Sequence, residues 1–337
     1  MTDGDSPDLV DPELRGLLSA LPQLSLSLDA LPQIRRDGDE MWRNLAAASG
    51  TAPDKGIRVA EKYVPGPPGA PAVRVLTYQP TRIRQTMPAY LHIHGGGYIL
   101  GTADSAEVAN RELAGRLSCF IVSVDYRLAP ETRAPGQVED CYAALKWLHS
   151  AAAQLRIDPE RIAIGGESAG GGLAAALALL ARDRGEVPIC FQNLVYPMLD
   201  DRTAALVKTN PYTGQHLWTH DSNRFGWTAL LGAAPGAVGV SPYAAPARAT
   251  NLRGLPPALI TVGALDLFLE EDIDYATRLM QAGVPTELHV YPGAYHGFDL
   301  ASESKLAQAM NRDRLNALRR ALSVALSGQP DRLRPGV

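Results

Sequence analysis

A serine stands at the centre of a glycine-flanked pentapeptide, Gly-Glu-Ser-Ala-Gly, at residues 166–170. An apolar, β-type stretch at 161–165 precedes the pentapeptide, and an Ala/Leu run follows it. Such a strand–turn–helix junction forces Ser168 into a strained turn that exposes its hydroxyl, and the helix directs its positive end toward a developing oxyanion. The pattern predicts a nucleophile for acyl transfer. The alternative is a glycine-rich bend that merely contains a serine.

A serine nucleophile needs a base to accept its proton and a third group to orient that base. His296 is the candidate base, because it follows the last expected strand in a glycine-punctuated loop that can carry an imidazole over a pocket. Asp266 also follows an expected strand and is the candidate orienting acid, although it could instead cap the next helix. Glu270 and Glu271 are runners-up that would equally suit the first turn of that helix.

Donors for the oxyanion are expected in the run His-Gly-Gly-Gly-Tyr at 94–98, which ends an apolar strand. Glycines let backbone N–H groups approach a ligand without interference from side chains. The candidates are the amides of Gly95, Gly96 and Gly97, together with that of Ala169 after the nucleophile. The alternative is a flexible turn. Phosphate binding is disfavoured, because neither glycine cluster continues into Gly-Lys-Ser/Thr or shows G-x-G-x-x-G.

The elements that must position these residues alternate along the chain. Strands are expected at 57–64, 72–79, 89–94, 119–126, 161–165, 191–197, 257–263 and 286–291, and helices at 107–117, 137–151, 169–182, 270–282 and 302–327. This alternation indicates an α/β fold with a mostly parallel central sheet of about eight strands and helices on both faces. The first two strands suit a hairpin, because a Pro/Gly-rich turn separates them. Chemistry is expected at the C-terminal ends of the strands.

Composition excludes several classes of function. The 337 residues carry a net charge of −4 and no long basic run, so neither nucleic acid nor an anionic membrane is expected as a partner. No stretch reaches the ~18 apolar residues of a membrane helix, and the polar N-terminus lacks the features of a signal peptide. Cys119, Cys141 and Cys190 are expected to be small core residues in a reducing, cytoplasmic compartment. No Cys/His cluster has metal-ligand spacing, so no metal or cofactor is expected.

One domain over residues 1–337 is expected, because neither repeats nor a low-complexity linker divide the chain. The strand–helix rhythm breaks at about 1–50 and about 200–245, and these segments are expected to pack together as a helical cap over the site. Substrate-pocket candidates come from the strand ends and the cap, with core packing as the alternative for each aromatic. They are Tyr98, Tyr126, Tyr196, Leu206, Trp218, Phe225 and Trp227.

Taken together, the motifs resemble those of bacterial hormone-sensitive-lipase-like esterases, which have the α/β-hydrolase fold. The resemblance covers about residues 60–325 and rests on the runs at 94–98, 125–131, 166–170, 196–197, 263–266 and 295–298. It implies Ser168 as nucleophile, His296 as base and Asp266 as its partner, with the cap described above. It also makes a homodimer an option, because such proteins often pair through the edge of the sheet.

Three further positions bear on this resemblance. The acid loop lacks the proline that the family often carries after the aspartate, since Leu267 stands there, which leaves the geometry of the loop open. Glu167 is expected to be a hydrogen-bonded structural carboxylate beneath the nucleophile. Arg127 is expected to tie loops together through charge-assisted hydrogen bonds.

The sequence therefore predicts a serine carboxylesterase that hydrolyses small esters through an acyl-enzyme on Ser168. Short to medium acyl chains are expected, because no broad apolar rim suited to an oil–water interface is evident. One alternative is a lactonase, an amidase or a specific deacetylase with the same triad. The other is a non-catalytic binding protein of this fold, of the kind that the plant gibberellin receptors represent.

Overall fold

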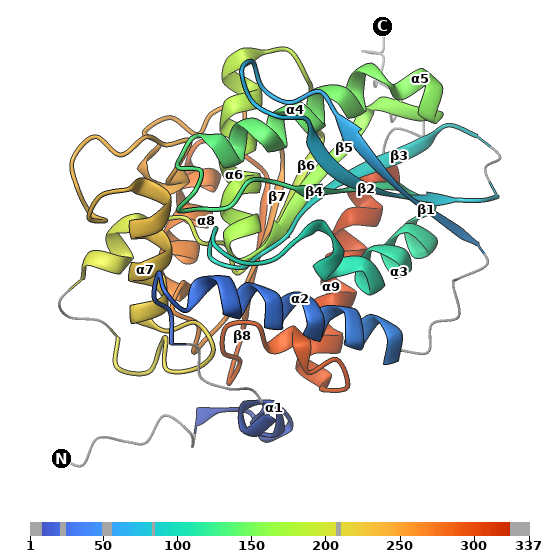
Figure 1. Cartoon of the computed structure of the whole chain (residues 1–337). Helices are drawn as coiled ribbons and strands as arrows, with labels where there is room; N and C mark the ends of the chain where they lie inside the picture. Colours follow the sequence, from blue (N-terminus) through green and yellow to red (C-terminus); the bar gives the residue numbers. More distant parts are fainter. Residues whose placement is uncertain (1–8, 21–24, 49–55, 83–84, 207–209, 324–337) are drawn as a thin grey trace, which may run out of the picture.

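The computed structural model of the chain describes residues 9–20, 25–48, 56–82, 85–206 and 210–323. In these residues, eight strands form one sheet in the order β1-β2-β4-β3-β5-β6-β7-β8 (Figure 1). The strands are β1 (Ile57–Val64), β2 (Val73–Pro80), β3 (Met87–Ile93), β4 (Phe120–Asp125), β5 (Ile157–Glu167), β6 (Phe191–Val195), β7 (Ala258–Gly263) and β8 (Thr286–Tyr291). β2 pairs antiparallel with β1 and β4, and the other neighbours are parallel. The expected sheet and its edge hairpin are confirmed.

Helices cover both faces of the sheet. α4 (Gly136–Ser150), α6 (Ala169–Arg184) and α8 (Leu269–Gln281) pack on one face, and α3 (Glu107–Leu117) and α9 (Lys305–Ser323) pack on the other. Successive side chains of a strand point to opposite faces, so Leu91 and Ile164 join the α6 side while Tyr90 and Ala163 join the α9 side. All seven residues of β3 are consequently buried, as a strand covered on both faces requires.

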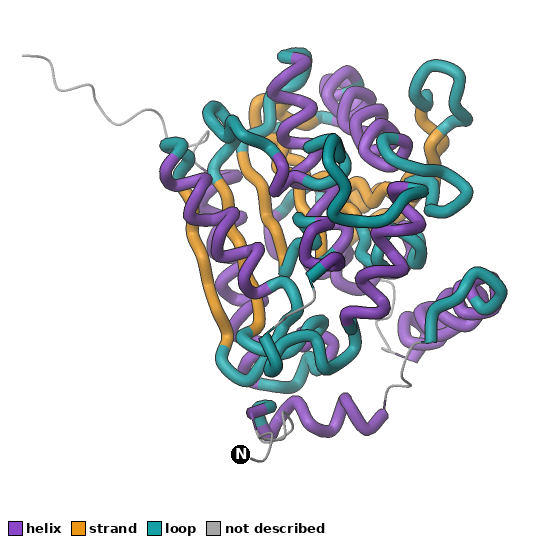
Figure 2. The backbone as a smooth tube through the Cα atoms, turned by 90° about the vertical axis from the view of Figure 1, so that its left-hand side faces the viewer, coloured by secondary structure: helices purple, strands orange, loops and turns teal. Residues whose placement is uncertain are grey.

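The remaining elements are short or lie outside these layers. They are α1 (Arg15–Ala20), α2 (Leu31–Ala48), α5 (Ala152–Leu155) and α7 (His220–Leu231), with the 3-10 turns η2 (Pro12–Leu14), η3 (Ala103–Ala106), η4 (Asp201–Ala205), η5 (Pro246–Arg248) and η6 (Phe298–Leu300). Figures 1 and 2 show α1 at the outer edge of the molecule, beyond the sheet and its covering helices. Residues 1–8, 21–24, 49–50 and 207–209 of the expected cap lie outside the described residues.

The largest difference from the expected boundaries is at β5. It begins at Ile157 rather than at 161, and Ile157 pairs with Met87 after a shift in register. The polar run at 158–160 hides this extension, because it breaks the apolar pattern that predicts a strand. Arg127 has the expected tying role: its Nε and Nη2 each donate to Asp140 at 2.8 Å and join the segment after β4 to α4.

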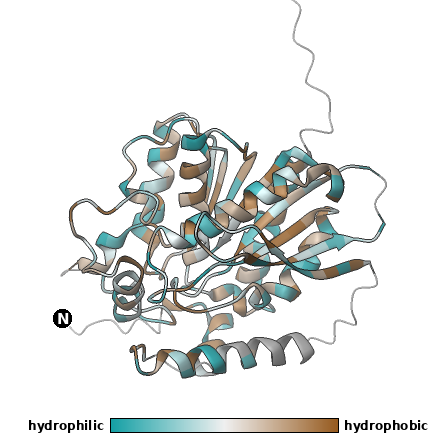
Figure 3. Cartoon of the chain, turned by 45° about the horizontal axis from the view of Figure 1, so that its top comes forward, coloured by the Kyte–Doolittle hydropathy of each residue, from teal (hydrophilic) through white to brown (hydrophobic). Residues whose placement is uncertain are grey.

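Hydropathy follows the layers. Figure 3 shows apolar residues gathered on the strands and on the central helices, and hydrophilic residues on the outer turns. α6 has the longest buried run, from Ala169 to Ala181, because it packs between the sheet and α4. Within the described ranges, no helix combines the length and the hydropathy needed to cross a membrane.

Candidate active site

Ser168 lies in the turn between β5 and α6. Its φ of 57° and ψ of −121° form a conformation that residues other than glycine rarely adopt. The chain passes so close to β3 here that a Cβ on Gly170 would lie 2.0 Å from the carbonyl oxygen of Ile93. Two hydrogen bonds join the turn to the segment at β6: Ser168 N donates to Val195 O at 2.9 Å, and Met198 N donates to Ser168 O at 3.0 Å. These contacts maintain a strained backbone at the serine.

The structure brings Ser168, Asp266 and His296 together from three strand ends. The Oγ of Ser168 lies 2.9 Å from Nε2 of His296, and Nδ1 of His296 lies 2.8 Å from Oδ2 of Asp266. The carboxylate favours the tautomer with the proton on Nδ1, which leaves Nε2 as a hydrogen-bond acceptor facing the serine hydroxyl. Asp266 is fully buried, and its Oδ1 also accepts the backbone N–H of Phe268 at 2.9 Å. The aspartate therefore both orients the imidazole and supports the turn into α8.

Aromatic rings surround the imidazole. The rings of Tyr196 and Phe268 meet it edge-on at centroid distances of 4.7 and 5.1 Å, and the ring of Trp218 lies tilted at 6.5 Å. Only 7% of His296 and 6% of Ser168 is exposed to solvent. Of the seven pocket candidates, Tyr196 and Trp218 are thus the two whose rings meet the imidazole.

The run Gly95 to Gly97 after β3, which we call the glycine loop, lies beside Ser168. A Cβ on Gly95 would be 3.4 Å from the Cβ of Ser168. Gly96 and Gly97 have φ values of 110° and 60°, which permit the tight path of the loop. In the described part of the chain, the amides of Gly96, Gly97 and Ala169 have no backbone acceptor. Donors from the loop and from the start of α6 are therefore available near Ser168.

His94, which precedes the glycine loop, is a structural residue. Its Nδ1 donates to the carbonyl oxygen of Gly95 at 2.8 Å, and its ring stacks on Tyr126 at 4.2 Å. Burial lowers the pKa of His94 to about 4, so its imidazole is neutral at physiological pH. This neutral ring supports the backbone from which the loop departs.

The other pocket candidates have different neighbours. Tyr98 and Tyr126 are buried, and their hydroxyls donate to the carbonyl oxygens of Met198 and His94 at 2.8 and 3.0 Å. Trp227 is fully buried with its ring 5.3 Å from that of Tyr98. These three pack in the core, which was the alternative for each of them. Phe225 is half-buried against the core, and Leu206 is exposed.

The two acidic runners-up bind other partners. Glu271 accepts hydrogen bonds from the backbone amides of Leu199 and Asp200 at 2.8 and 3.2 Å and from the hydroxyl of Thr203. Glu270 lies 3.4 Å from the side-chain amide of Asn210. Both carboxylates therefore connect α8 to the segment after β6.

Glu167 is the hydrogen-bonded structural carboxylate that the sequence predicts, and both of its partners were missed by sequence reasoning. Its Oε2 lies 2.8 Å from Nε2 of His92, and its Oε1 accepts from Nη2 of Arg314 at 2.6 Å. Burial raises the pKa of Glu167, but the charges of His92 and Arg314 outweigh burial and lower it to about 2. Arg314 comes from α9, 147 residues away, and only its place on an amphipathic helix distinguishes it in the sequence.

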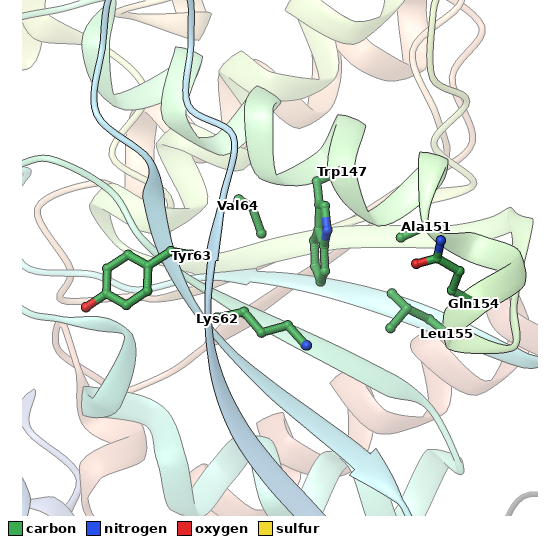
Figure 4. Close-up of a pocket in the computed structure, with 7 residues that line it drawn as sticks. All are labelled: Lys62, Tyr63, Val64, Trp147, Ala151, Gln154 and Leu155. Atoms are coloured by element: carbon green, nitrogen blue, oxygen red, sulfur yellow. The ribbon is translucent and has the colours of Figure 1, made fainter.

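A hollow of about 280 Å³ lies away from this site, between β1, α4 and α5. Figure 4 shows Trp147, Leu155 and the ammonium of Lys62 around it, with the ring of Tyr63 turned away. None of its lining residues belongs to the group around Ser168.

A serine, an aspartate and a histidine in this chain order, joined by hydrogen bonds at the C-terminal edge of a mostly parallel sheet, define the class of α/β hydrolases. Residues 90–300 match a protein family described by the alpha/beta hydrolase fold. The chain belongs to this family, and within it to the bacterial esterases that resemble hormone-sensitive lipase.

Similar proteins include esterases over nearly the whole length of the chain. Esterase LipI of Mycobacterium tuberculosis is 35% identical, over 87% of this chain and 89% of its own. Carboxylesterase NlhH of the same organism is 34% identical, over 94% and 97%. A solved bacterial heroin esterase is 41% identical, with a TM-score of 0.86 and coverage of 94% and 98%. The chain is accordingly a carboxylic ester hydrolase.

The substitution Glu167→Gln tests the partly buried ion pair with Arg314. It leaves Arg314 without its anionic partner, so the free energy of unfolding at pH 7 should fall by about 3 kcal/mol. The folded pKa of about 2 lies below the ordinary value of 4.5, so the charge stabilises the fold above pH 4.5 and loses this effect as the pH falls toward 2. Urea unfolding at several pH values should show that the free energies of unfolding of the unmodified protein and of Glu167→Gln become similar as the pH falls toward 2.

The control is Glu112→Gln, whose carboxylate forms an exposed pair with Arg116 within α3. Its effect should stay below about 0.5 kcal/mol. An equal loss of stability for Glu167→Gln at pH 7 and at pH 3 would contradict the assigned charge.

Proposed function

We propose that the chain hydrolyses carboxylic esters through an acyl-enzyme on Ser168. The observation that supports this most directly is the 2.9 Å contact between Ser168 Oγ and His296 Nε2, with Nδ1 on the buried carboxylate of Asp266. Ser168 attacks the ester carbonyl as His296 takes its proton, and His296 then protonates the departing alkoxide. Water, deprotonated by His296, attacks the acyl-enzyme, which releases the acid and restores the serine.

In this proposal, the oxyanion of each tetrahedral intermediate accepts hydrogen bonds from the glycine loop, Gly95 to Gly97, and from Ala169. The support is the position of the loop beside Ser168 and the backbone amides without acceptors in the described residues. Ala169 also begins α6, whose helix dipole favours negative charge at this end. Donors fixed before the reaction need no reorganisation when the charge develops.

The proposed cap, from about 1–50 and about 200–245, contacts the loops that carry the site. Its N-terminal part meets residues 292–300 after β8, which we call the histidine loop; here the Tyr295 hydroxyl donates to Leu14 O at 2.9 Å. It also meets the segment after the glycine loop, where Arg35 Nε donates to Ile99 O at 2.8 Å. Both contacts support a role for the N-terminal segment in enclosing the site.

The second part of the proposed cap includes residues 214–218, which we call the strap. Gly214 N donates to Leu265 O at 3.2 Å, next to the proposed acid. The side chain of Leu217 approaches the histidine loop, where a Cβ on Gly297 would lie 3.7 Å from its Cδ1. The strap therefore reaches two of the loops that carry the proposed triad.

Trp218, the last residue of the strap, lies against the glycine loop. Its ring edge lies so near the glycine loop that a Cβ on Gly97 would be 2.0 Å from Cη2, and the same ring lies 6.5 Å from that of His296. Its Nε1 is held 3.4 Å from Oδ1 of Asn223. A fixed indole here limits the room beside the nucleophile, which supports short to medium acyl chains. The heroin esterase relative likewise acts, by its name, on a small molecule.

Two finer proposals concern the setting of the enzyme. A cytoplasmic location is supported by Cys119, Cys141 and Cys190, all of which are free thiols.

A homodimer is supported by β8, which ends the sheet and pairs with β7 alone among the described strands. Light scattering should then give twice the mass of one chain, and the mass of a single chain would contradict the dimer.

The substitution Ser168→Ala tests the nucleophile. It should lower kcat for p-nitrophenyl butyrate by at least about 10³-fold, because the acyl-enzyme can no longer form. A fluorophosphonate should label the unmodified protein and not the variant, whereas the exposed control Ser302→Ala should keep full activity and labelling. Retention of half the activity by Ser168→Ala would exclude this role. Amide and lactone substrates in the same assay separate an esterase from an amidase or a lactonase.

The substitution Trp218→Ala tests whether the indole of Trp218 limits the length of the acyl chain. Removal of the indole should raise kcat/KM for a p-nitrophenyl dodecanoate relative to the butyrate by about tenfold, because added methylenes then find apolar room. Trp147→Ala is the matched control, since this half-buried tryptophan lines only the remote hollow. An unchanged ratio of the two esters in Trp218→Ala would contradict the proposed wall.

A further inference from the structure

Tyr196, directly after β6, lies between the turn that carries Ser168 and the imidazole of His296. Its neighbours bracket the serine, because Val195 O accepts from Ser168 N at 2.9 Å and Met198 N donates to Ser168 O at 3.0 Å. Its own ring meets the ring of His296 at 4.7 Å with an interplanar angle of 62°. One residue thus spans the distance between the nucleophile and the base.

The backbone of Tyr196 is confined as well. Its φ of 33° lies in the left-handed region, which is unfavourable for a bulky residue. Its amide donates to the carbonyl oxygen of Thr261 on β7 at 2.6 Å. Such a conformation persists only where the surroundings determine it, so the ring has a fixed starting point.

The far end of the phenol is fixed by an aspartate of the histidine loop. The Tyr196 hydroxyl donates to Oδ1 of Asp299 at 2.6 Å, a short bond typical of a charged acceptor. Asp299 lies in η6, three residues after His296. The ring of Tyr196 therefore contacts the start of this segment, and its hydroxyl binds the end.

Arg314 connects this pair to the ion pair beneath Ser168. Burial raises the pKa of Asp299, and the nearby charge of Arg314 opposes this effect. The same guanidinium donates to Glu167, the residue before the nucleophile, at 2.6 Å. Arg314 thus interacts both with Glu167, next to Ser168, and with Asp299, in the same loop as His296.

We propose that Tyr196 and Asp299 form a positioning pair that keeps His296 Nε2 on Ser168 Oγ during proton transfer. The inference rests on the proposed function, because it assigns the pair to that same reaction. Neither residue takes or gives a proton in the mechanism. Their effect is geometric: without the hydroxyl anchor, the ring of Tyr196 and the histidine loop can move, and the 2.9 Å contact is lost in a fraction of molecules.

Three variants test the pair. Tyr196→Phe keeps the ring and removes the anchor, Asp299→Ala removes the acceptor, and Asp299→Asn keeps an oxygen that can accept. The first two should lower kcat for p-nitrophenyl butyrate by roughly tenfold with KM within about twofold, because small misplacements of reacting groups lower rates steeply. Asp299→Asn should retain most of kcat. The double variant Tyr196→Phe/Asp299→Ala should lose no more than either single one.

Tyr291→Phe is the matched control. The hydroxyl of Tyr291 donates to Asp313 at 2.8 Å, and Tyr291 is 7% exposed against 4% for Tyr196. Its ring contacts Phe298, whereas the ring of Tyr196 contacts His296. Its kcat should be unchanged. Thermal unfolding of each variant identifies any loss of folded protein, and Tyr196→Phe alone decides the question if Asp299→Ala does not fold.

Full kcat in Tyr196→Phe, additive losses in the double variant, or an equal loss in Tyr291→Phe would overturn the positioning role. These results are distinct from failure of the proposed function. If Ser168→Ala is inactive while Tyr196→Phe is fully active, only the pair is refuted. If Ser168→Ala stays active, the acyl-enzyme itself is refuted.

Discussion

The backbone conformation of Ser168 is the constraint on which the rest of the site depends. A residue other than glycine in such a conformation costs on the order of 1–3 kcal/mol, and the surroundings must supply this energy. Here they are two hydrogen bonds to the segment at β6 and a turn that fits against β3 because Gly170 has no Cβ. The strain directs the hydroxyl away from its own helix and toward the histidine loop. Neighbouring strands therefore determine where the hydroxyl of Ser168 points.

The parallel sheet brings together side chains that are distant in the chain. Ser168, Asp266 and His296 follow β5, β7 and β8, whose C-terminal ends lie on one edge of the sheet. Burial at this edge makes each charge expensive unless it is paired. Asp266 is accordingly bound by the imidazole and by the amide of Phe268, and Glu167 by His92 and Arg314. The carboxylates of the site are thus fully engaged before any substrate arrives.

The strands, the covering helices and the loops that carry the site could be predicted from the sequence, because apolar periodicity and glycine-rich strand ends are local signals. Arg314 and Asp299 could not. Each is one charged residue on a short turn or an amphipathic helix, and its role arises from contacts across 147 and 103 positions. The aromatic candidates were equally ambiguous, since a tyrosine such as Tyr126 looks the same in a pocket and in a core. Only tertiary packing distinguishes Tyr196, whose ring contacts the imidazole, from Tyr98, whose ring packs on Trp227.

The position of Arg314 on α9 determines when the contact with Glu167 can form during synthesis of the chain. Synthesis proceeds from the N-terminus, and a domain generally folds as a unit. A nascent chain that has passed His296 already contains all three members of the proposed triad, yet Glu167 then has only His92 as a partner. The ion pair beneath the serine closes when α9 packs against the sheet. The environment of the residue before Ser168 is therefore complete only when this C-terminal helix has packed against the sheet.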